Sequence, residues 1–489
     1  MTSIAGSNRL DVNTPKPLHA GPRSGELFSN LKSARFLNAT ARSVGFLKRK
    51  TTKLTPMVLI QALIACVLSG RCSFRRLAFE VGLFLDSGEG GQPGTYSKQA
   101  FAKRIGAPAV AFVKKVVADS IRRSALGSRQ TAIEGLKGVK GVLVGDSSVF
   151  TFHPSLRSHH PGSSNQHGVA TAQVRFQLVF DLLGGRWLQG EPRPYRENDR
   201  SAARQILQGV LKAGDLLIRD LGYASIGVFE EIAAMKAWFL SRMIPGAVLF
   251  EAASGTRLDP LALAREKAPR PGDVCSVPVL LGVGKRLPCR LVIRNDGERV
   301  GSERRRRLAK EAKRRGTAPA KPYLKLQNWT LLVSNLDEGA ASSEQLLALY
   351  ETRWRIENVF KLAKSETKLS KLVGHRSNPH HIDLLLWGWI LAMVEFGKMG
   401  FFATIESRLR SDGRSECVPV ERSIFKAMER LLEIAATAIE LAAAGSLAEL
   451  MRRTMAQIEY HDRYEKRERK SLPALIGRVL NLHHAYALG

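Results

Sequence analysis

The sequence predicts an α/β protein in which a sheet-containing core lies between two helical regions. Helical periodicity runs from about Leu31 to Leu126 and returns after Gly374, whereas short β-branched or alternating runs begin near Gly138. The chain has 489 residues, which corresponds to about three structural units. Its hydrophobic fraction of 44% and aromatic fraction of 7% are sufficient for packed cores and exclude a disordered chain.

The charge balance predicts a polyanionic partner. Lys and Arg number 75 against 44 Asp and Glu, a net charge of +31, which favours nucleic acid or anionic lipid over acidic partners. The five cysteines are scattered and form no C-x-x-C pair, which indicates free thiols in a reducing compartment and excludes a structural zinc site of the usual spacing.

Membrane insertion is not expected. Thr55–Leu68 is too short to span a bilayer, and Ile382–Phe402 is interrupted by Asp383, Glu395 and Lys398. Both segments are interpreted as buried helices. With no apolar signal segment near its start, the chain is expected to be a soluble cytoplasmic protein that handles nucleic acid.

Residues 1–135 are predicted to form a basic, helical region that binds DNA ends. Ser97 is a predicted N-cap for Lys98–Ile105, a short helix that carries Lys98, Lys103 and Arg104. A solvated helical domain without a DNA-binding role is the alternative.

Residues 136–225 are predicted to form the first part of the core. The pattern gives a strand, a β-hairpin, a helix and another strand, at Val142–Val144, Gln173–Gly190 with a turn at Gly184-Gly185, Asp199–Leu211 and Leu216–Ile218. This order is the opening of the ribonuclease-H-like fold. Asp146 and Asp220 directly follow its first and fourth strands, where open α/β sheets place their sites.

The remaining chain is divided by a break in this pattern. Residues 226–325 are expected to be a β-rich insertion, which also holds the strongly basic helix Arg299–Arg315. That helix either follows a DNA backbone or is a solvated face. Residues 326–374 are predicted to complete the core with strand Thr330–Ser334 and a long helix Ser343–Leu369, and residues 375–489 to be helical.

Four residues of the long helix are predicted to share one face. At about 100° per residue, Tyr350, Arg353, Glu357 and Lys364 fall within an arc of about 60°. The face combines an aromatic hydroxyl, two cations and one carboxylate. Arg353 with Glu357 taken alone is also an ordinary i, i+4 surface pair.

These residues resemble a known signature. Tyr350-x2-Arg353-x3-Glu357-x6-Lys364 is similar to the Tyr-Arg-Glu-Lys motif of bacterial DDE transposases of the insertion sequence four family. Asp146-Ser147-Ser148 and Asp220-Leu221-Gly222-Tyr223 resemble that family's first and second aspartate motifs, although Leu221 stands where a basic residue is expected. The resemblance covers about residues 135–375, and the longer gap before Glu357 is similar to the strand-rich insertion of the family.

The resemblance implies a metal-dependent site. Asp146, Asp220 and Glu357 would be catalytic and would hold two Mg²⁺ ions, with Mn²⁺ as a substitute, for phosphodiester cleavage and strand transfer. Tyr350, Arg353 and Lys364 would bind DNA phosphates. Trp238 or Trp329 would stack a flipped base, or else pack in a core.

The implied partners are double-stranded DNA, as terminal inverted repeats and as target, and a second copy of the chain on DNA, near the bacterial nucleoid. Three other functions remain open: a stand-alone nuclease of the same fold, an inactive transposase-derived DNA-binding protein, and an RNA- or lipid-surface protein that uses charge alone. The histidine pairs His159-His160, His380-His381 and His483-His484 are not expected to bind metal, because adjacent residues do not face one site on a helix.

Overall fold

The computed structural model describes most of residues 33–397 and a short segment after them. The described residues are 33–49, 53–68, 73–83, 85, 96–126, 136–164, 168, 170–182, 186–197, 207–316, 318–354, 356–357, 360–361, 379–397, 405–411 and 414–420.

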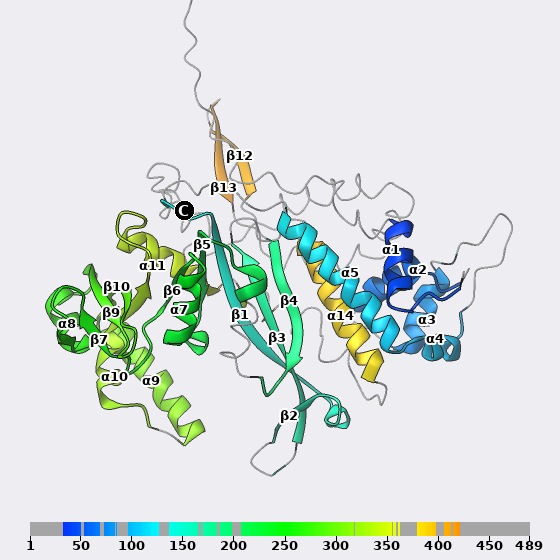
Figure 1. Cartoon of the computed structure of the whole chain (residues 1–489), viewed down its shortest axis with the longest axis horizontal. Helices are drawn as coiled ribbons and strands as arrows, with labels where there is room; N and C mark the ends of the chain where they lie inside the picture. Colours follow the sequence, from blue (N-terminus) through cyan, green and yellow to red (C-terminus); the bar gives the residue numbers. More distant parts are fainter. Residues whose placement is uncertain are drawn as a thin grey trace, which may run out of the picture.

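A large mixed sheet crosses the molecule and helices cover its two faces (Figure 1). The helices before the sheet are α1 (Ala34–Ser43), α2 (Pro56–Leu68), α3 (Phe74–Leu83), α4 (Lys98–Arg104) and α5 (Ala107–Leu126). The later helices are α7 (Ile226–Ala234), α8 (Pro260–Lys267), α9 (Gly297–Arg315), α10 (Lys321–Lys325), α11 (Ser343–Glu351) and α14 (Pro379–Gly397). The sheet strands are β1 (Gly141–Phe152), β2 (Pro161–Ser164), β3 (Ala170–Asp181), β4 (Arg186–Pro194), β5 (Asp215–Arg219), β6 (Trp238–Arg242), β7 (Leu249–Glu251), β8 (Arg257–Leu258), β9 (Val274–Leu281), β10 (Leu287–Asn295) and β11 (Trp329–Ser334).

The strand order places β1 next to β5 near the middle of the sheet. The order is β2-β3-β1-β5-β6-β11-β10-β9-β7-β8, and β4 pairs with β3. β1, β5 and β6 are mutually parallel, whereas β3 and β4 form the antiparallel hairpin that the alternation in the sequence predicted. The central residues of the parallel strands, such as Val142–Val144 and Leu216–Ile218, are apolar and buried because both faces of the sheet are covered.

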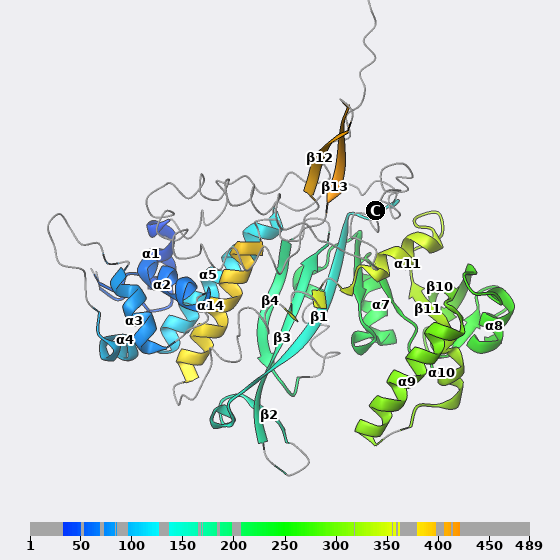
Figure 2. The ribbon, with the colours of Figure 1, turned by 180° about the vertical axis from the view of Figure 1, so that it is seen from behind.

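Alternate side chains of the strands enter two separate cores. Val142 and Val144 of β1 belong to the core formed with α2, α5, α11 and α14, whereas Leu143 belongs to the core formed with α7 and α8. The view from behind shows α7 and α14 on different sides of the central strands (Figure 2).

The two most apolar segments of the sequence are buried helices, as predicted. α2 packs against α14 so closely that a Cβ added at Gly388 would lie 2.5 Å from Leu63 Cγ. Glu395, in the apolar face of α14, accepts a 2.6 Å hydrogen bond from the Ser120 hydroxyl of α5. Among the described helices, none is long and apolar enough to cross a membrane.

The basic helices predicted near Ser97 and Arg299 are both present. The Ser97 hydroxyl accepts the N–H of Ala100 at the start of α4. In α9, Arg304 and Arg305 turn inward to pair with Asp296 and Glu298, so only part of its charge faces solvent.

Two sequence expectations about the later chain differ from the structure. The insertion was expected to start at residue 226, but α7 leads into β6, which pairs in parallel with β5 and so continues the preceding sheet. The segment after residue 375 was expected to be helical, but Ile405–Ser411 (β12) and Arg414–Val420 (β13) form an antiparallel pair. Asp412-Gly413 between them is a hairpin signal that the helical reading overlooked.

Candidate active site

The register of β1 and β5 brings two aspartates to the same edge of the parallel pair. The last paired residues are Gly145 and Arg219, so Asp146 and Asp220 are each the next residue along their strands. β5 ends there, whereas β1 continues to Phe152 because β3 pairs with it further. Asp146 therefore lies at the end of the parallel pairing, not at the end of its strand as the sequence predicted.

Asp146 is held in a partly buried position where its charge is costly. Its Oδ1 accepts the N–H of Ser147 at 2.7 Å, and its Oδ2 lies 3.7 Å from Nη1 of Arg353. Burial, with smaller contributions from Asp220 and Glu357, raises the pKa of Asp146 from 3.8 to about 6, although Ser147 and Arg353 act in the opposite direction. Carboxylates with this environment favour a bound cation.

The helix predicted to carry the third carboxylate is interrupted. α11 starts with a capping box between Ser342 and Gln345 and ends at Glu351. The Thr352 hydroxyl donates to the Leu349 carbonyl at 2.5 Å, and Arg353 N–H bonds to the Tyr350 carbonyl three residues back. Side-chain bonding to the backbone and the tighter turn break the regular helix. Helical geometry resumes at 354 and 356–357.

Despite this break, Arg353 still lies close to Tyr350 and Glu357, as the sequence predicted. Its Nη2 donates to Glu357 Oε1 at 2.9 Å, and its guanidinium lies 6.0 Å from the centre of the Tyr350 ring. Opposite charges on Asp220, Glu357 and Asp146 contribute to raising the pKa of Arg353 against the effect of its burial. Asp146 and Glu357 thus contact one guanidinium, and Asp220 lines the same cavity as that side chain. Lys364 lies outside the described residues.

The donor set fits a hard divalent cation. All three acids offer oxygen ligands, as Mg²⁺ prefers, and neither a thiol nor an imidazole is needed. In the part of the chain that the structure describes, these three carboxylates do not form a group whose ligand atoms all lie within 4.8 Å. Arg353 lies between two of these acids, with Nη1 3.7 Å from Asp146 Oδ2 and Nη2 2.9 Å from Glu357 Oε1.

A cavity of about 270 Å³ adjoins Asp220 and is rich in arginine. Arg294 and Arg304 in its wall are paired with acids, at 2.9 Å to Glu351 and 2.9 Å to Asp296 respectively. Arg242, at the end of β6, has no acidic partner within the described ranges. These cavity arginines were not singled out from the sequence, because their proximity depends on the pairing of β6, β11 and β10.

The tryptophans considered for base stacking are packing residues in this structure. The indole N–H of Trp329 donates to the Ala268 carbonyl at 2.9 Å, and Trp238 packs against the core near Gly138. Trp354, which the sequence reading did not select, lines the cavity together with Tyr350.

Asp146→Asn is expected to stabilise the metal-free protein at neutral pH. Because the pKa is raised in the folded state, the stabilising contribution of the protonated carboxyl is fully present below about pH 3.8. It is lost as the pH rises through about 6. The rise in pKa corresponds to a loss of at most about 3 kcal/mol of folding stability when the carboxyl ionises. The neutral amide of the introduced asparagine does not ionise, so the variant avoids this loss. Chemical denaturation of variant and wild type, with a chelator present, measures the difference in their free energies of unfolding at pH 8 and at pH 4.5. The same difference at both pH values would contradict the prediction.

A family model and curated relatives place the chain among known proteins. A family model described as a transposase DDE domain matches residues 137–393, more than half of the chain. The transposase for insertion sequence element IS231B of Bacillus thuringiensis subsp. berliner is 26% identical over 284 residues, 55% of this chain and 59% of that protein. The transposase for IS1151 of Clostridium perfringens is 23% identical over 319 residues, 61% of this chain and 65% of that protein.

The match thus spans less than two thirds of the length of these relatives. Among solved structures, a piggyBac transposase synaptic complex with hairpin DNA aligns with 88% of this chain and 82% of that one, at 14% identity and a TM-score of 0.38. That alignment is too weak to support a conclusion.

Proposed function

Because this chain belongs to the transposase DDE domain family, whose model spans its sheet and α11, we propose that it is a DNA transposase that cuts and joins the ends of its own insertion sequence. The supporting observation is that Asp146 and Glu357 both contact Arg353, and that Asp220 lies beside them at the same edge of the sheet. A ribonuclease-H-like core formed by β1, β3, β4, β5 and β6 agrees with this function, and the insertion then begins after β6.

The three acids are proposed to be the metal ligands. Two bound Mg²⁺ ions would supply activation of water or a 3′-hydroxyl and stabilisation of the leaving oxygen. The raised pKa of Asp146 means that a nearby cation is needed to keep its carboxylate charged in slightly acidic solution.

The residues around the acids are proposed to hold DNA phosphates. Burial raises the pKa of Tyr350 to about 12, so its hydroxyl remains protonated and can donate a hydrogen bond. Arg353, once displaced from Asp146 and Glu357, can contact a phosphate through two N–H groups. Lys364 is proposed for the same role from its place in the sequence motif.

Arg242 is a further phosphate-binding candidate. It is a half-buried cation in the cavity beside Asp220, and no acid neutralises it in the described part of the chain. A guanidinium in such a place is well suited to an anionic oxygen.

Arg242→Gln is expected to weaken binding of the element end by about 10- to 100-fold, because a charge-assisted hydrogen bond contributes about 1.5–3 kcal/mol. The slope of log affinity against log salt should also fall by about 1. Fluorescence anisotropy at several salt concentrations measures both. Lys285→Gln is the control, because it removes an exposed cation from the segment between β9 and β10. Equal losses of affinity in the two variants would argue against a specific contact by Arg242.

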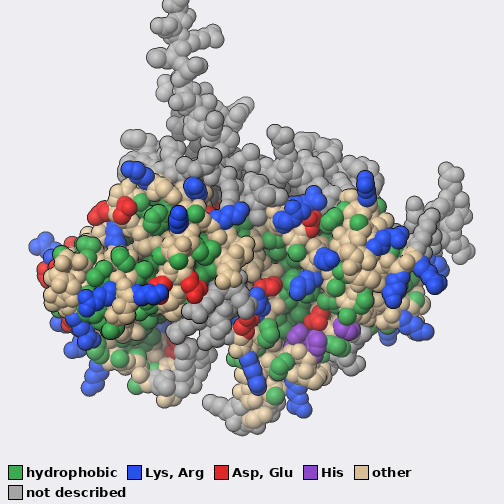
Figure 3. Space-filling view, viewed as in Figure 1, with side chains coloured by type: hydrophobic (Ala, Val, Ile, Leu, Met, Phe, Trp, Pro, Cys, Tyr) green, Lys and Arg blue, Asp and Glu red, His purple; other side chains and the backbone are tan. Residues whose placement is uncertain are grey.

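DNA and a second copy of the chain are the proposed partners. Lys and Arg side chains are spread over the face shown in Figure 3, which agrees with contact along a nucleic acid backbone. Synapsis of two inverted repeats and joining to target DNA require at least a homodimer on DNA. We place this activity at the bacterial nucleoid, in the cytoplasm.

The test uses the DNA that flanks this gene, end-labelled, with full-length protein and a plasmid target. Nicking at a defined boundary followed by joining to the plasmid, with Mg²⁺ or Mn²⁺ and not with a chelator, is the expected result. Cutting without joining would indicate a stand-alone nuclease. Tight binding without cutting in either metal would indicate an inactive DNA-binding descendant.

A further inference from the structure

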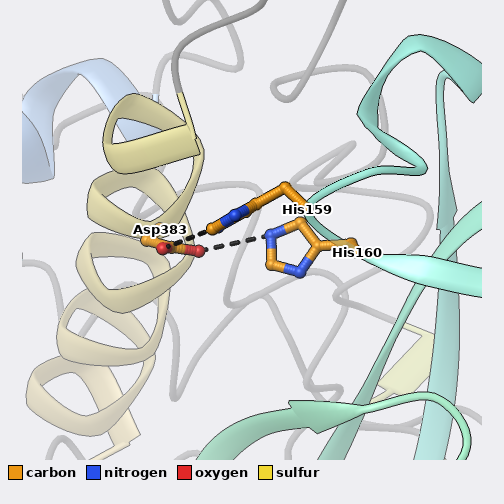
Figure 4. A group of neighbouring side chains, drawn as sticks. All are labelled: His159, His160 and Asp383. Carbon is orange, nitrogen blue, oxygen red and sulfur yellow. Dashed lines mark hydrogen bonds and ion pairs between the residues drawn. The ribbon is translucent and has the colours of Figure 1, made fainter.

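A second group of ligand-type side chains lies away from the DDE acids. His159 and His160 are in the turn that leads from β1 to β2, and Asp383 is in the first turns of α14. Both imidazoles point at the Asp383 carboxylate (Figure 4). The sequence reading rejected a site here because neighbours do not share a helix face, but these neighbours are in a turn, where that restriction does not apply.

The distances in this group suit a tetrahedral metal ion. His159 Nε2 lies 3.0 Å from Asp383 Oδ2, and His160 Nε2 lies 3.2 Å from Asp383 Oδ1. With Zn–N and Zn–O bonds of about 2.0–2.1 Å, two ligands of a tetrahedron are separated by about 3.3 Å. Both separations are close to that value, although the two nitrogens face different oxygens of Asp383.

The group is also compact and partly buried: its three ligand atoms, one from each residue, all lie within 4.8 Å of one another. His160 Nε2 is buried and faces Asp383 Oδ1 at 3.2 Å, without the geometry of a hydrogen bond. A metal ion could bind this nitrogen in place of that contact.

We propose that His159, His160 and Asp383 form a Zn²⁺ site that joins the turn after β1 to the start of α14. Two imidazoles and one carboxylate are ligands that zinc accepts, whereas Mg²⁺ prefers oxygen alone. The His159 side chain is 36% exposed, which leaves the fourth position open to water. Because β1 carries Asp146, the ion would link the strand of one candidate catalytic acid to the helix α14, which packs beside the sheet.

The test measures zinc binding directly, on untagged full-length protein stripped with a chelator. Isothermal titration is performed with excess Mg²⁺, which occupies the oxygen-only site. One Zn²⁺ per chain is expected for the wild type, with a higher melting temperature. His159→Ala and Asp383→Asn should weaken binding by at least the roughly 10- to 100-fold that loss of even an outer-shell partner costs.

His153→Asn is the matched control, because His153 is an exposed histidine of the same turn and asparagine can replace its cap to Ser155. Binding should be unchanged in this variant. Co²⁺ in place of zinc should give the strong visible absorption of a tetrahedral site, lost in His159→Ala. His159 is on the surface, so this variant is expected to fold even if Asp383→Asn does not.

Absence of zinc binding by the wild type, or equal binding by all variants, would show that the group is only an ion pair. Both measurements are made without DNA, so a negative result leaves the proposed transposase activity unaffected.

Discussion

Asp146→Asn, Asp220→Asn and Glu357→Gln are each expected to reduce metal-dependent cutting and joining by at least about 1,000-fold. Each amide removes one anionic ligand while nearly keeping the shape of the side chain. Charge stabilisation by bound metal contributes several kcal/mol, and each 1.4 kcal/mol is a factor of ten in rate. DNA binding should be retained, since removal of a negative charge does not weaken contact with phosphates.

The stability of the Asp146 variant can exclude misfolding as the cause of its lost activity. Asp146→Asn should be more stable than the wild type at neutral pH without metal, because burial disfavours the ionised carboxylate. An inactive variant with increased stability cannot owe its loss of activity to unfolding. Glu303→Gln is the control: its side chain is 50% exposed and pairs only with Arg299 in the described residues, so activity should remain normal.

Metal specificity distinguishes a ligand from a neighbouring acid. In Asp220→Cys the hard oxygen ligand becomes a softer sulfur, which Mn²⁺ tolerates better than Mg²⁺. Partial activity restored by Mn²⁺ alone would support direct coordination. Cutting that survives the Asp146, Asp220 and Glu357 substitutions would place the catalytic site elsewhere.

Much of this site could be predicted from the sequence because its signals are local. A β-branched run ending in Gly145-Asp146 and a short apolar run ending in Arg219-Asp220 indicate two strands, and parallel neighbours bring their carboxyl ends together. The grouping of Tyr350, Arg353 and Glu357 follows from helical spacing and survives the turn at Thr352, because the Arg353–Glu357 ion pair still forms.

The rest of the site depends on long-range pairing. Arg242 lines the same cavity as Asp220 only because β6 lies between β5 and β11, and no local pattern indicates that order. Likewise, His159 and Asp383 are 224 residues apart and meet through the packing of α14 beside the central strands. The break in α11 also escaped the sequence reading, because helical periodicity does not show that the Thr352 hydroxyl bonds to a backbone carbonyl.

Trp389→Ala is expected to lower the free energy of unfolding by about 3–5 kcal/mol, the usual cost of removing a large buried aromatic side chain. Trp389 is 1% exposed, and its ring centre lies 5.4 Å from that of Phe176, 6.3 Å from Phe150 and 6.4 Å from Trp187. These partners belong to β3, β1 and β4, so the side chain attaches α14 to the strand that carries Asp146. Urea denaturation followed by circular dichroism measures the loss.

Trp387→Ala is the matched control because it removes the same side chain from the same helix at a half-buried position. Trp387 packs at the edge of the core, and Lys114 Nζ lies 5.5 Å from its ring centre, an interaction of about 0.5–1 kcal/mol at an exposed site. Its substitution should therefore cost clearly less than that of Trp389. Equal losses would mean that Trp389 and its aromatic partners do not attach α14 to the strand that carries Asp146.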